Sequence, residues 1–295
     1  MMTEPLVSIV LPTFNGSRYL EQAIQSCLDQ TYNNWELIIV DDASTDRTPE
    51  IIARHVATDS RVRSLRHTTN RRLPGALNTG FAQAKGDYLT WTSDDNLYRP
   101  PALAEMVDLL ERESDTGIVY TDFTMIDELG NRIISVEAPA PEELATHNCV
   151  GPCFLYRRVV HERVGGYAED LFLAEDYDFW LRASNLFRLR PLHKNLYLYR
   201  RHPASLTDLQ ARQIRIATEL ALARNLPQMH WLGNRVRASG YVHLATMAEL
   251  RNDSLTTWKC LWHAALCNPR ILFTSRIAGL LIRSVIGKRV RLFSA

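Results

Sequence analysis

The stretch VSIVLPTFNGSRYLEQAIQSCLDQTYNNWELIIVDDASTDRT, at residues 7–48, indicates the fold class of this chain. Two short apolar runs, at 6–12 and 35–40, are rich in β-branched residues and predict buried strands. Between them, apolar side chains recur at helical spacing over 19–28, which predicts a helix with one apolar face. Strands that alternate with helices are typical of an α/β domain with a mostly parallel sheet.

The same alternation of strands and helices continues to residue 123. A helix is expected after Ser44 and Thr45, because Asp46 and Pro49 are typical of a helix start. The remaining expected elements are strands at 62–66, 87–92 and 118–123 and helices at 73–84 and 101–112. In a parallel sheet, polar residues just beyond the carboxyl ends of the strands line the ligand crevice. A functional site is therefore expected at the carboxyl ends of the predicted strands.

Three strand ends carry acids, an amide and an aromatic ring. They are Thr13, Phe14 and Asn15 after the first strand, Asp41 and Asp42 after the second, and Asp94 and Asp95 after the fourth. A carboxylate such as that of Asp42 can accept the imide N–H of a uracil or the ribose hydroxyls, or it can cap the next helix. Phe14 can stack on a base or pack in the core.

The pair Asp94-Asp95 is a candidate for cation binding. Mg²⁺ and Mn²⁺ bind carboxylate oxygens together with substrate phosphates more often than they bind full cages of protein ligands. The alternative is a turn without a ligand, because the sequence Ser93-Asp94-Asp95-Asn96 is also typical of turns.

The second half of the chain adds a further group of candidate residues. Glu175 and Asp176 precede an apolar helix face, where an acid can act as a general base or only interact with the helix dipole. Arg200, Arg201 and His202 are candidates for binding a diphosphate or its metal, or they form a solvated basic turn.

Four stretches in this order resemble the family-2 glycosyltransferases of the GT-A fold, which are inverting enzymes. The stretches are residues 7–48, then NRRLPGALNTGFAQAKGDYLTWTSDD at 70–95, GGYAEDLFLAEDYDFWLRAS at 165–184 and YRRHPASLT at 199–207. The resemblance implies an α/β catalytic domain at 1–207, with a donor-binding part at 1–123 and an acceptor part at 124–207. A helical C-terminal extension would occupy 208–295.

The resemblance also implies roles for individual residues. Asp42 would contact the base, as the same position does in uridine-nucleotide members, and Asp176, with Glu175 beside it, would be the general base. Residues implied to contact the donor are Pro12, Thr13, Phe14, Asn15, Asp42, Asn70, Asn78, Asp94 and Arg200. Residues implied at a Mg²⁺ or Mn²⁺ ion are Asp95 as the direct ligand, Asp94 and His202.

The implied reaction moves one sugar, of the hexosyl type, from a nucleotide diphosphate to an acceptor hydroxyl with inversion. A Gln-x-x-Arg-Trp motif, typical of processive synthases, does not occur in the sequence, which favours single transfer. Two positions depart from the family pattern: Thr92 stands where an acid is frequent, and Leu77 where Arg is frequent. The second departure removes a contact with the donor that is frequent in the family. UDP is the expected nucleotide of the donor.

Charge and cysteine usage exclude several other classes of protein. The formal net charge of +1 argues against a nucleic-acid binder. The N-terminal residues do not read as a secretion signal, and the five cysteines suggest reduced thiols in a cytoplasmic protein. Cys149 and Cys153 are expected to be small buried hydrophobes, with a zinc site as the alternative.

The C-terminal third combines apolar and basic residues. Helices are expected over 206–226 and 241–266, with a break at Asn268-Pro269. After Asp253 the sequence has seven Lys or Arg residues and no acid. Two interpretations remain open: a helical cap on the catalytic domain, or a peripheral contact with the inner face of an anionic membrane. The acceptor is expected to be a carbohydrate or a lipid-linked sugar, as in cell-surface polysaccharide or glycolipid assembly.

Three other functions fit the same elements less well. A nucleotidyltransferase should have a Gly-rich basic loop after its first strand, where this chain has Pro-Thr-Phe-Asn-Gly-Ser-Arg. A dinucleotide oxidoreductase should have Gly-x-Gly-x-x-Gly there. A non-catalytic module that binds sugar nucleotides would not need Asp94, Asp95 and Asp176 together.

Overall fold

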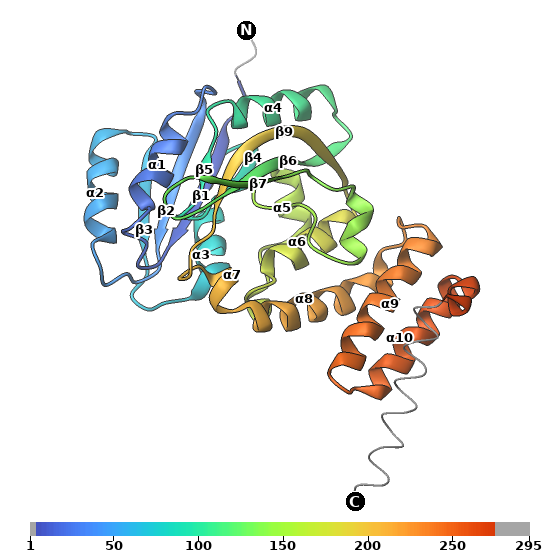
Figure 1. Cartoon of the computed structure of the whole chain (residues 1–295). Helices are drawn as coiled ribbons and strands as arrows, with labels where there is room; N and C mark the ends of the chain where they lie inside the picture. The colour runs from blue at the N-terminus through green and yellow to red at the C-terminus, as the bar shows by residue number, and fades with distance from the viewer. Residues whose placement is uncertain (1–3, 275–295) are drawn as a thin grey trace, which may run out of the picture.

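The computed structural model describes residues 4–274, and its first third follows the predicted alternation of strands and helices (Figure 1). The elements in this part are β1 (Val7–Thr13), α1 (Leu20–Leu28), β2 (Trp35–Asp41), α2 (Thr48–Thr58), β3 (Val62–Arg66), α3 (Arg72–Phe81) and β4 (Tyr88–Trp91). Strands β1, β2 and β4 coincide with short apolar runs, and β3 coincides with the strand expected at 62–66. Apolar runs of this length form strands because both of their faces can be buried under helices.

The nine strands form one sheet in the order β3-β2-β1-β4-β8-β6-β9-β5, with β7 paired to β6. Strands β3, β2, β1 and β4 are all parallel, and β6 is parallel to β9 over a long ladder. The antiparallel ladders that β8, β5 and β7 form are shorter. The expected α/β fold with a mostly parallel sheet is confirmed.

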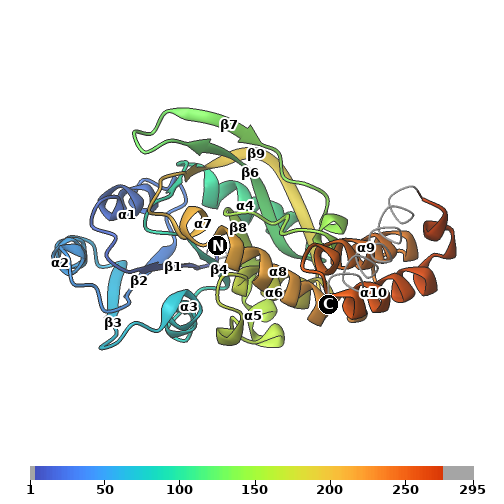
Figure 2. The same cartoon turned by 60° about the horizontal axis from the view of Figure 1, so that its bottom comes forward.

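The second part of the sheet is built from longer and more irregular strands. Its elements are β5 (Leu97–Tyr98), α4 (Ala102–Arg112), β6 (Thr116–Ile126), β7 (Arg132–Val136), η1 (Pro141–Ala145), β8 (Phe154–Arg157), α5 (Arg158–Val164), η2 (Glu169–Leu171), α6 (Glu175–Ser184) and β9 (Arg188–Arg200). The β6–β9 ladder contains register shifts near Thr121 and Asp122, and such irregularities bend a strand and increase its twist. The hairpin of β6 and β7 therefore curves over one side of the molecule (Figure 2).

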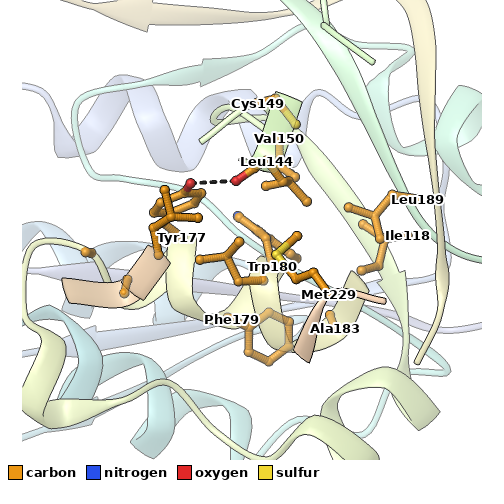
Figure 3. Packing of buried hydrophobic residues seen from close by; sticks show 14 of the residues in the cluster. Ile118, Leu144, Cys149, Val150, Tyr177, Phe179, Trp180, Ala183, Leu189 and Met229 are labelled. Atoms are coloured by element: carbon orange, nitrogen blue, oxygen red, sulfur yellow. Dashed lines mark hydrogen bonds between the residues drawn. The ribbon is translucent and has the colours of Figure 1, made fainter. Parts of the chain in front are cut away.

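The hydrophobic core has two layers, one on each face of the sheet. Ile9 and Leu11 of β1 pack on the side of α1, α2 and α4, whereas Val10 faces α3 and α6. This alternation is the period of two that a strand buried on both faces imposes. Trp180 of α6 is fully buried in the second layer (Figure 3), where the Tyr177 hydroxyl also donates a hydrogen bond to the Leu144 carbonyl at 2.6 Å.

Helices follow the sheet, as expected for the C-terminal extension. They are α7 (Leu206–Leu209), α8 (Ala211–Asn225), η3 (Leu226–Gln228), α9 (Asn234–Leu250), α10 (Ser254–Cys267) and η4 (Pro269–Phe273). Helix α8 packs on α6, and Met229 lies near Trp180 in the core (Figure 3). Figures 1 and 2 both place α9 and α10 at the end of the molecule that is remote from α1 and α2.

The stretch 241–266 is two helices rather than the single helical run that its composition indicated. Asn252 has a left-handed φ of 61°, and the Asp253 side chain accepts a hydrogen bond from the Thr256 amide at 3.0 Å. Asn and Asp favour such chain reversals and helix caps, which explains the division. The expected break at Asn268-Pro269 is confirmed, because α10 ends at Cys267.

The structure describes only part of the basic C-terminal tail. Its residues Arg276, Arg283, Lys288, Arg289 and Arg291 lie outside the described residues. Within residues 4–274, no helix is both long enough and apolar enough to cross a bilayer.

Candidate active site

The ends of β1, β2 and β4 bring two of the predicted acids together through Thr13. The Thr13 carbonyl accepts a hydrogen bond from the Asp42 amide at 2.9 Å, and its hydroxyl donates to Asp94 Oδ2 at 2.5 Å. Parallel pairing of β1 with β2 and β4 sets this arrangement, because it places all three carboxyl ends at one edge. Asp42 and Asp94 therefore both lie at this edge of the sheet, on either side of Thr13.

The loop after β1 lies tightly against this edge. Asn15 has a left-handed φ of 54°, its amide donates to Ser44 Oγ at 2.9 Å, and its side chain accepts from the Thr45 amide at 2.8 Å. Gly16 is required here, because a Cβ at this position would lie 2.0 Å from Asp94 Oδ2. Phe14 in the same loop is 49% exposed, which excludes the core role and leaves its ring available to a ligand. Pro12 is buried within β1.

Asp42 is held by two donors and does not cap the following helix. Its Oδ1 accepts from His67 Nδ1 at 2.7 Å and from the Arg71 amide at 2.8 Å. At the start of α2 the Asp46 carboxylate has this role, because it accepts a hydrogen bond from the Thr48 amide at 3.0 Å. His67 was missed in the sequence analysis. Its signal is its position directly after β3, at the same edge of the sheet.

Asp94 and Asp95 are carboxylates with little access to solvent. Burial raises the pKa of Asp94 to about 7; the neighbouring Asp95 charge adds to the shift and the Thr13 bond opposes it. Burial also raises the pKa of Asp95, whereas the hydrogen bond and charge of His202 oppose that shift. The Asp95 Oδ2 atom lies 3.0 Å from His202 Nε2. Adjacent carboxylates with raised pKa values can bind a cation, which would favour their charged forms.

The surroundings of Asp95 fit a divalent cation that takes most of its ligands from a substrate. Asp95 Oδ1 is buried and has no hydrogen-bond partner in the described structure. A buried oxygen of this kind is costly unless a ligand binds it. Among residues 4–274 no three His, Cys, Asp or Glu side chains form a ready cage, and Mg²⁺ and Mn²⁺ do not need one when phosphates complete their coordination. Cys149 and Cys153 are both buried free thiols.

Arg200 is buried, and its guanidinium is bonded to the protein on all sides. Its Nε donates to the Asp95 carbonyl at 3.0 Å, Nη2 to Gln22 Oε1 at 2.8 Å and Nη1 to the Glu128 carbonyl at 3.1 Å. The guanidinium also lies over the Tyr19 ring, 4.6 Å from its centre. These contacts hold the Asp95 turn in place and leave little of the group for a diphosphate. The neighbouring Arg201 pairs with Asp208.

Asp176 and Glu175 lie together at the first turn of α6. Asp176 Oδ2 accepts from Asn148 Nδ2 at 2.8 Å, and Glu175 Oε2 accepts from the Leu173 amide at 2.7 Å. Burial and the adjacent Asp176 carboxylate raise the pKa of Glu175 to about 8, and burial raises the pKa of Asp176. A carboxylate with a raised pKa is a stronger base. Asn148 was also missed, because it lies in an irregular loop without a periodic pattern.

Tyr167 lies in the segment that precedes these acids. Burial raises the pKa of its phenol; hydrogen bonding with Tyr156 and Trp91 opposes the shift, and the Asp176 and Glu175 charges add to it. Asn78 fixes this segment from α3, because its side chain accepts from the Tyr167 amide at 2.8 Å and donates to the Tyr167 carbonyl at 2.9 Å. Asn70 is exposed and accepts from the Arg72 amide at 2.9 Å.

Neither departure from the family pattern faces the site. Thr92 is buried, and its hydroxyl lies 2.6 Å from the Tyr197 hydroxyl across the sheet. Leu77 is buried in the core layer that contains Val10 and Val40. These side chains contribute to packing and do not contact the strand-end acids.

The model of the family "Glycosyl transferase family 2" matches residues 8–165, which is more than half of the chain. The chain belongs to this family. The Bacillus subtilis protein EpsE, whose name also places it among glycosyltransferases, is 35% identical over 208 residues. These residues cover 68% of this chain and 74% of EpsE. The matched region contains β1, β2 and β4, whose ends form the site described above.

Two solved structures of glycosyltransferases share the fold. The mannosyltransferase PcManGT from Pyrobaculum calidifontis, in complex with GDP-Man and Mn²⁺, aligns with a TM-score of 0.64 at 20% identity, over 99% of this chain and 81% of that one. S. aureus TarS 1-349, in complex with UDP, aligns with a TM-score of 0.62 at 16% identity, over 95% and 88% of the two chains. The family-2 chain is therefore a glycosyltransferase with the fold of nucleotide-sugar enzymes.

Proposed function

We propose that this glycosyltransferase is an inverting, metal-dependent enzyme that transfers one sugar from a UDP-sugar to an acceptor hydroxyl. The observation that carries the proposal is the link Asp42–Thr13–Asp94 at the sheet edge, with Asp95 next in sequence and Asp176 bonded to Asn148 at the start of α6. Asp42 is available for the nucleobase, Asp95 for a cation and Asp176 for the acceptor proton.

The donor nucleotide is assigned to the β1 and β2 ends. The Asp42 carboxylate is oriented by His67 and by the Arg71 amide, both of which bond Oδ1. An oriented acceptor of this kind matches the imide N–H of uracil. Phe14 and Asn15 lie on the loop beside it, so that Phe14 is placed to stack on the base or ribose. The UDP preference rests on Asp42, because the structural relatives include one complex with UDP and one with GDP-Man.

The diphosphate is assigned to the turn after β4. Asp95, with Asp94 and His202 beside it, would hold a Mg²⁺ or Mn²⁺ ion, which when bound neutralises the charge on the leaving diphosphate. Asp94 is fixed by Thr13 and Asp95 by the Arg200 bonds to its carbonyl. We leave Arg200 out of the donor contacts and treat it as a positioning residue, because its guanidinium is already bonded to the protein. Asn78 and Asn70 have similar roles in shaping the donor side.

The acceptor proton is assigned to Asp176. The Asn148 amide orients one carboxylate oxygen, and burial raises the pKa of Asp176. Glu175 is more deeply buried and bonds the chain before α6, so its role is to hold this corner in place rather than to contact the acceptor. Inversion follows if the acceptor hydroxyl, as Asp176 removes its proton, attacks the anomeric carbon from the face opposite the leaving diphosphate.

The place of the reaction is proposed from the thiols. All five cysteines are free, and two of them, Cys260 and Cys267, are partly exposed, which suits a reducing cytoplasmic compartment. Polysaccharide or glycolipid assembly at the cell surface, with a carbohydrate or lipid-linked acceptor, is the pathway class that we propose.

A donor screen tests the proposal. Release of nucleoside diphosphate is measured with UDP-, GDP- and dTDP-sugars, with Mn²⁺ and with a chelator. We expect Mn²⁺-dependent release that is greatest for a UDP-sugar and that the Asp42→Ala substitution weakens. A preference for GDP-sugars would contradict the role of Asp42, and absence of release from every donor would favour a non-catalytic module.

A further inference from the structure

Helix α10 presents apolar side chains on two opposite faces. Thr257, Leu261 and Ala264 are buried against α9. On the other face, Leu255, Trp258, Trp262 and Leu266 form a line at helical spacing that we call the α10 stripe; Leu255 is 67% exposed and Trp262 66%. A helix that is apolar on both faces is normally buried on both, whereas residues 4–274 leave the stripe uncovered.

Two further exposed apolar side chains flank the stripe in sequence. Leu250, at the end of α9, and Phe273, after α10, are exposed, and Phe273 is 90% exposed. Singly exposed hydrophobic residues are common, but several on one face mark a surface that binds a partner. The two tryptophans indicate the kind of partner, because an indole prefers an environment with an apolar side and a polar side.

The charged side chains within α10 and η4 are basic. Lys259 and Arg270 are exposed beside it, and the chain has no acid after Asp253. The other residues have the opposite balance: of 34 Lys and Arg residues, 27 precede Asp253, against 33 Asp and Glu residues in the whole chain. A partner of this region must therefore tolerate or prefer positive charge.

We infer that the α10 stripe binds the surface of an anionic lipid bilayer. Leucine and phenylalanine side chains would enter the acyl boundary, tryptophans would lie at the headgroup level, and Lys259 and Arg270 would contact acidic headgroups. A second copy of the chain fits less well, because a symmetric contact through the stripe would bring two basic C-terminal regions together.

The position of α10 also connects this surface to the acceptor side. Helix α10 packs on α9, and α9 lies so close to η1 that a Cβ on Gly240 would be 2.7 Å from the Ala145 carbonyl. The chain that leaves η1 carries Asn148, which bonds Asp176. A bilayer at α10 would hold a lipid-linked acceptor near that loop; this last step rests on the proposed function, whereas lipid binding does not.

Vesicle co-sedimentation of the full chain tests the inference. The vesicles contain phosphatidylcholine alone or with phosphatidylglycerol, and the double variant Trp262→Ser with Leu266→Ser is compared with wild type. We expect wild type to bind the anionic vesicles and the variant to bind them roughly tenfold or more weakly, because two large apolar side chains are lost. The matched control is Ile133→Ser with Ile134→Ser, which removes two exposed side chains of β7 and should bind as wild type does.

Three results would overturn the inference: equal binding by the stripe variant, equal binding of wild type to both vesicles, or no binding of wild type. Sedimentation velocity without lipid adds a fourth, since a wild-type dimer that the stripe variant abolishes would make the stripe a subunit interface. Circular dichroism and lipid-free donor hydrolysis should be unchanged in the variant. Because binding is measured without activity, its failure is distinct from failure of the proposed transferase reaction.

Discussion

The Asp176 and Glu175 carboxyl groups share one corner at the start of α6. Burial makes both of them weaker acids, and the charge of one disfavours ionisation of the other. The two side chains differ in their surroundings: Glu175 is buried and bonded to the Leu173 amide, whereas Asp176 is partly exposed beside Asn148. This difference is why we assign the acceptor proton to Asp176 and not to Glu175.

Substitution of Asp176 tests the base directly. Asp176→Asn keeps the size of the side chain and its place beside Asn148 but cannot take a proton. We expect turnover to fall by about a hundred- to ten-thousand-fold, with the Kd for UDP unchanged. Steady-state kinetics and calorimetric titration provide the two values. A variant with wild-type turnover would show that another group removes the acceptor proton.

The raised pKa of Glu175 predicts that the free energy of unfolding depends on pH. Its pKa is about 8 in the folded chain and about 4.3 in an unfolded one, so folding takes up a proton between these values. Its contribution to the free energy of unfolding is therefore fully present below about pH 4.3 and is lost as the pH rises toward 8. Glu175→Gln removes this titration and should gain stability relative to wild type between pH 5 and 8, as urea unfolding at several pH values would show. If the free energy of unfolding changed with pH equally in wild type and in Glu175→Gln, the raised pKa of Glu175 would be contradicted.

At the scale of elements, the site depends on how closely the loops after β1 and β4 approach each other. Gly16→Ala would place a Cβ 2.0 Å from Asp94 Oδ2 and 2.6 Å from Thr13 Oγ1, so the β4 turn has to move. We expect kcat/KM for the donor to fall by roughly a hundredfold, because misplacement by about 1 Å has this effect on positioned groups. The control is Gly233→Ala, where a Cβ meets nothing within 4 Å. Wild-type kcat/KM in Gly16→Ala would show that Asp94 does not position the donor.

The elements that apolar patterning marks are the ones that could be predicted. Strands β1, β2 and β4 are short apolar runs under helices, and their ends carry the acids. Strand β9 could not be predicted in the same way, because Arg188–Arg200 alternates poorly, contains Pro191 and keeps several side chains exposed. Its partner β6 is 62 residues or more distant in sequence, and the register shifts between them depend on packing that no local pattern encodes.

At the scale of the whole molecule, the site joins parts of the chain that are far apart. Arg200 at the end of β9 bonds Gln22 of α1, the Glu128 carbonyl beyond β6 and the Asp95 carbonyl after β4. The sequence analysis identified Arg200 by its charge and assigned it to the diphosphate. Its bonding partners could not be foreseen, because they are main-chain and amide oxygens that a motif does not specify. For the same reason, the sequence did not indicate His67 as a partner of Asp42 or Asn148 as a partner of Asp176.

Calorimetric titration of UDP, with and without Mn²⁺, into wild type and Asp95→Asn tests the central claim most directly. If the acid after β4 holds a cation against the diphosphate, Mn²⁺ should lower the Kd of wild type for UDP by about tenfold or more and should have little effect in the variant. Asp176→Asn serves as the control and should respond to Mn²⁺ as wild type does. An equal Mn²⁺ effect in wild type and Asp95→Asn would contradict the assignment of the donor site to this sheet edge.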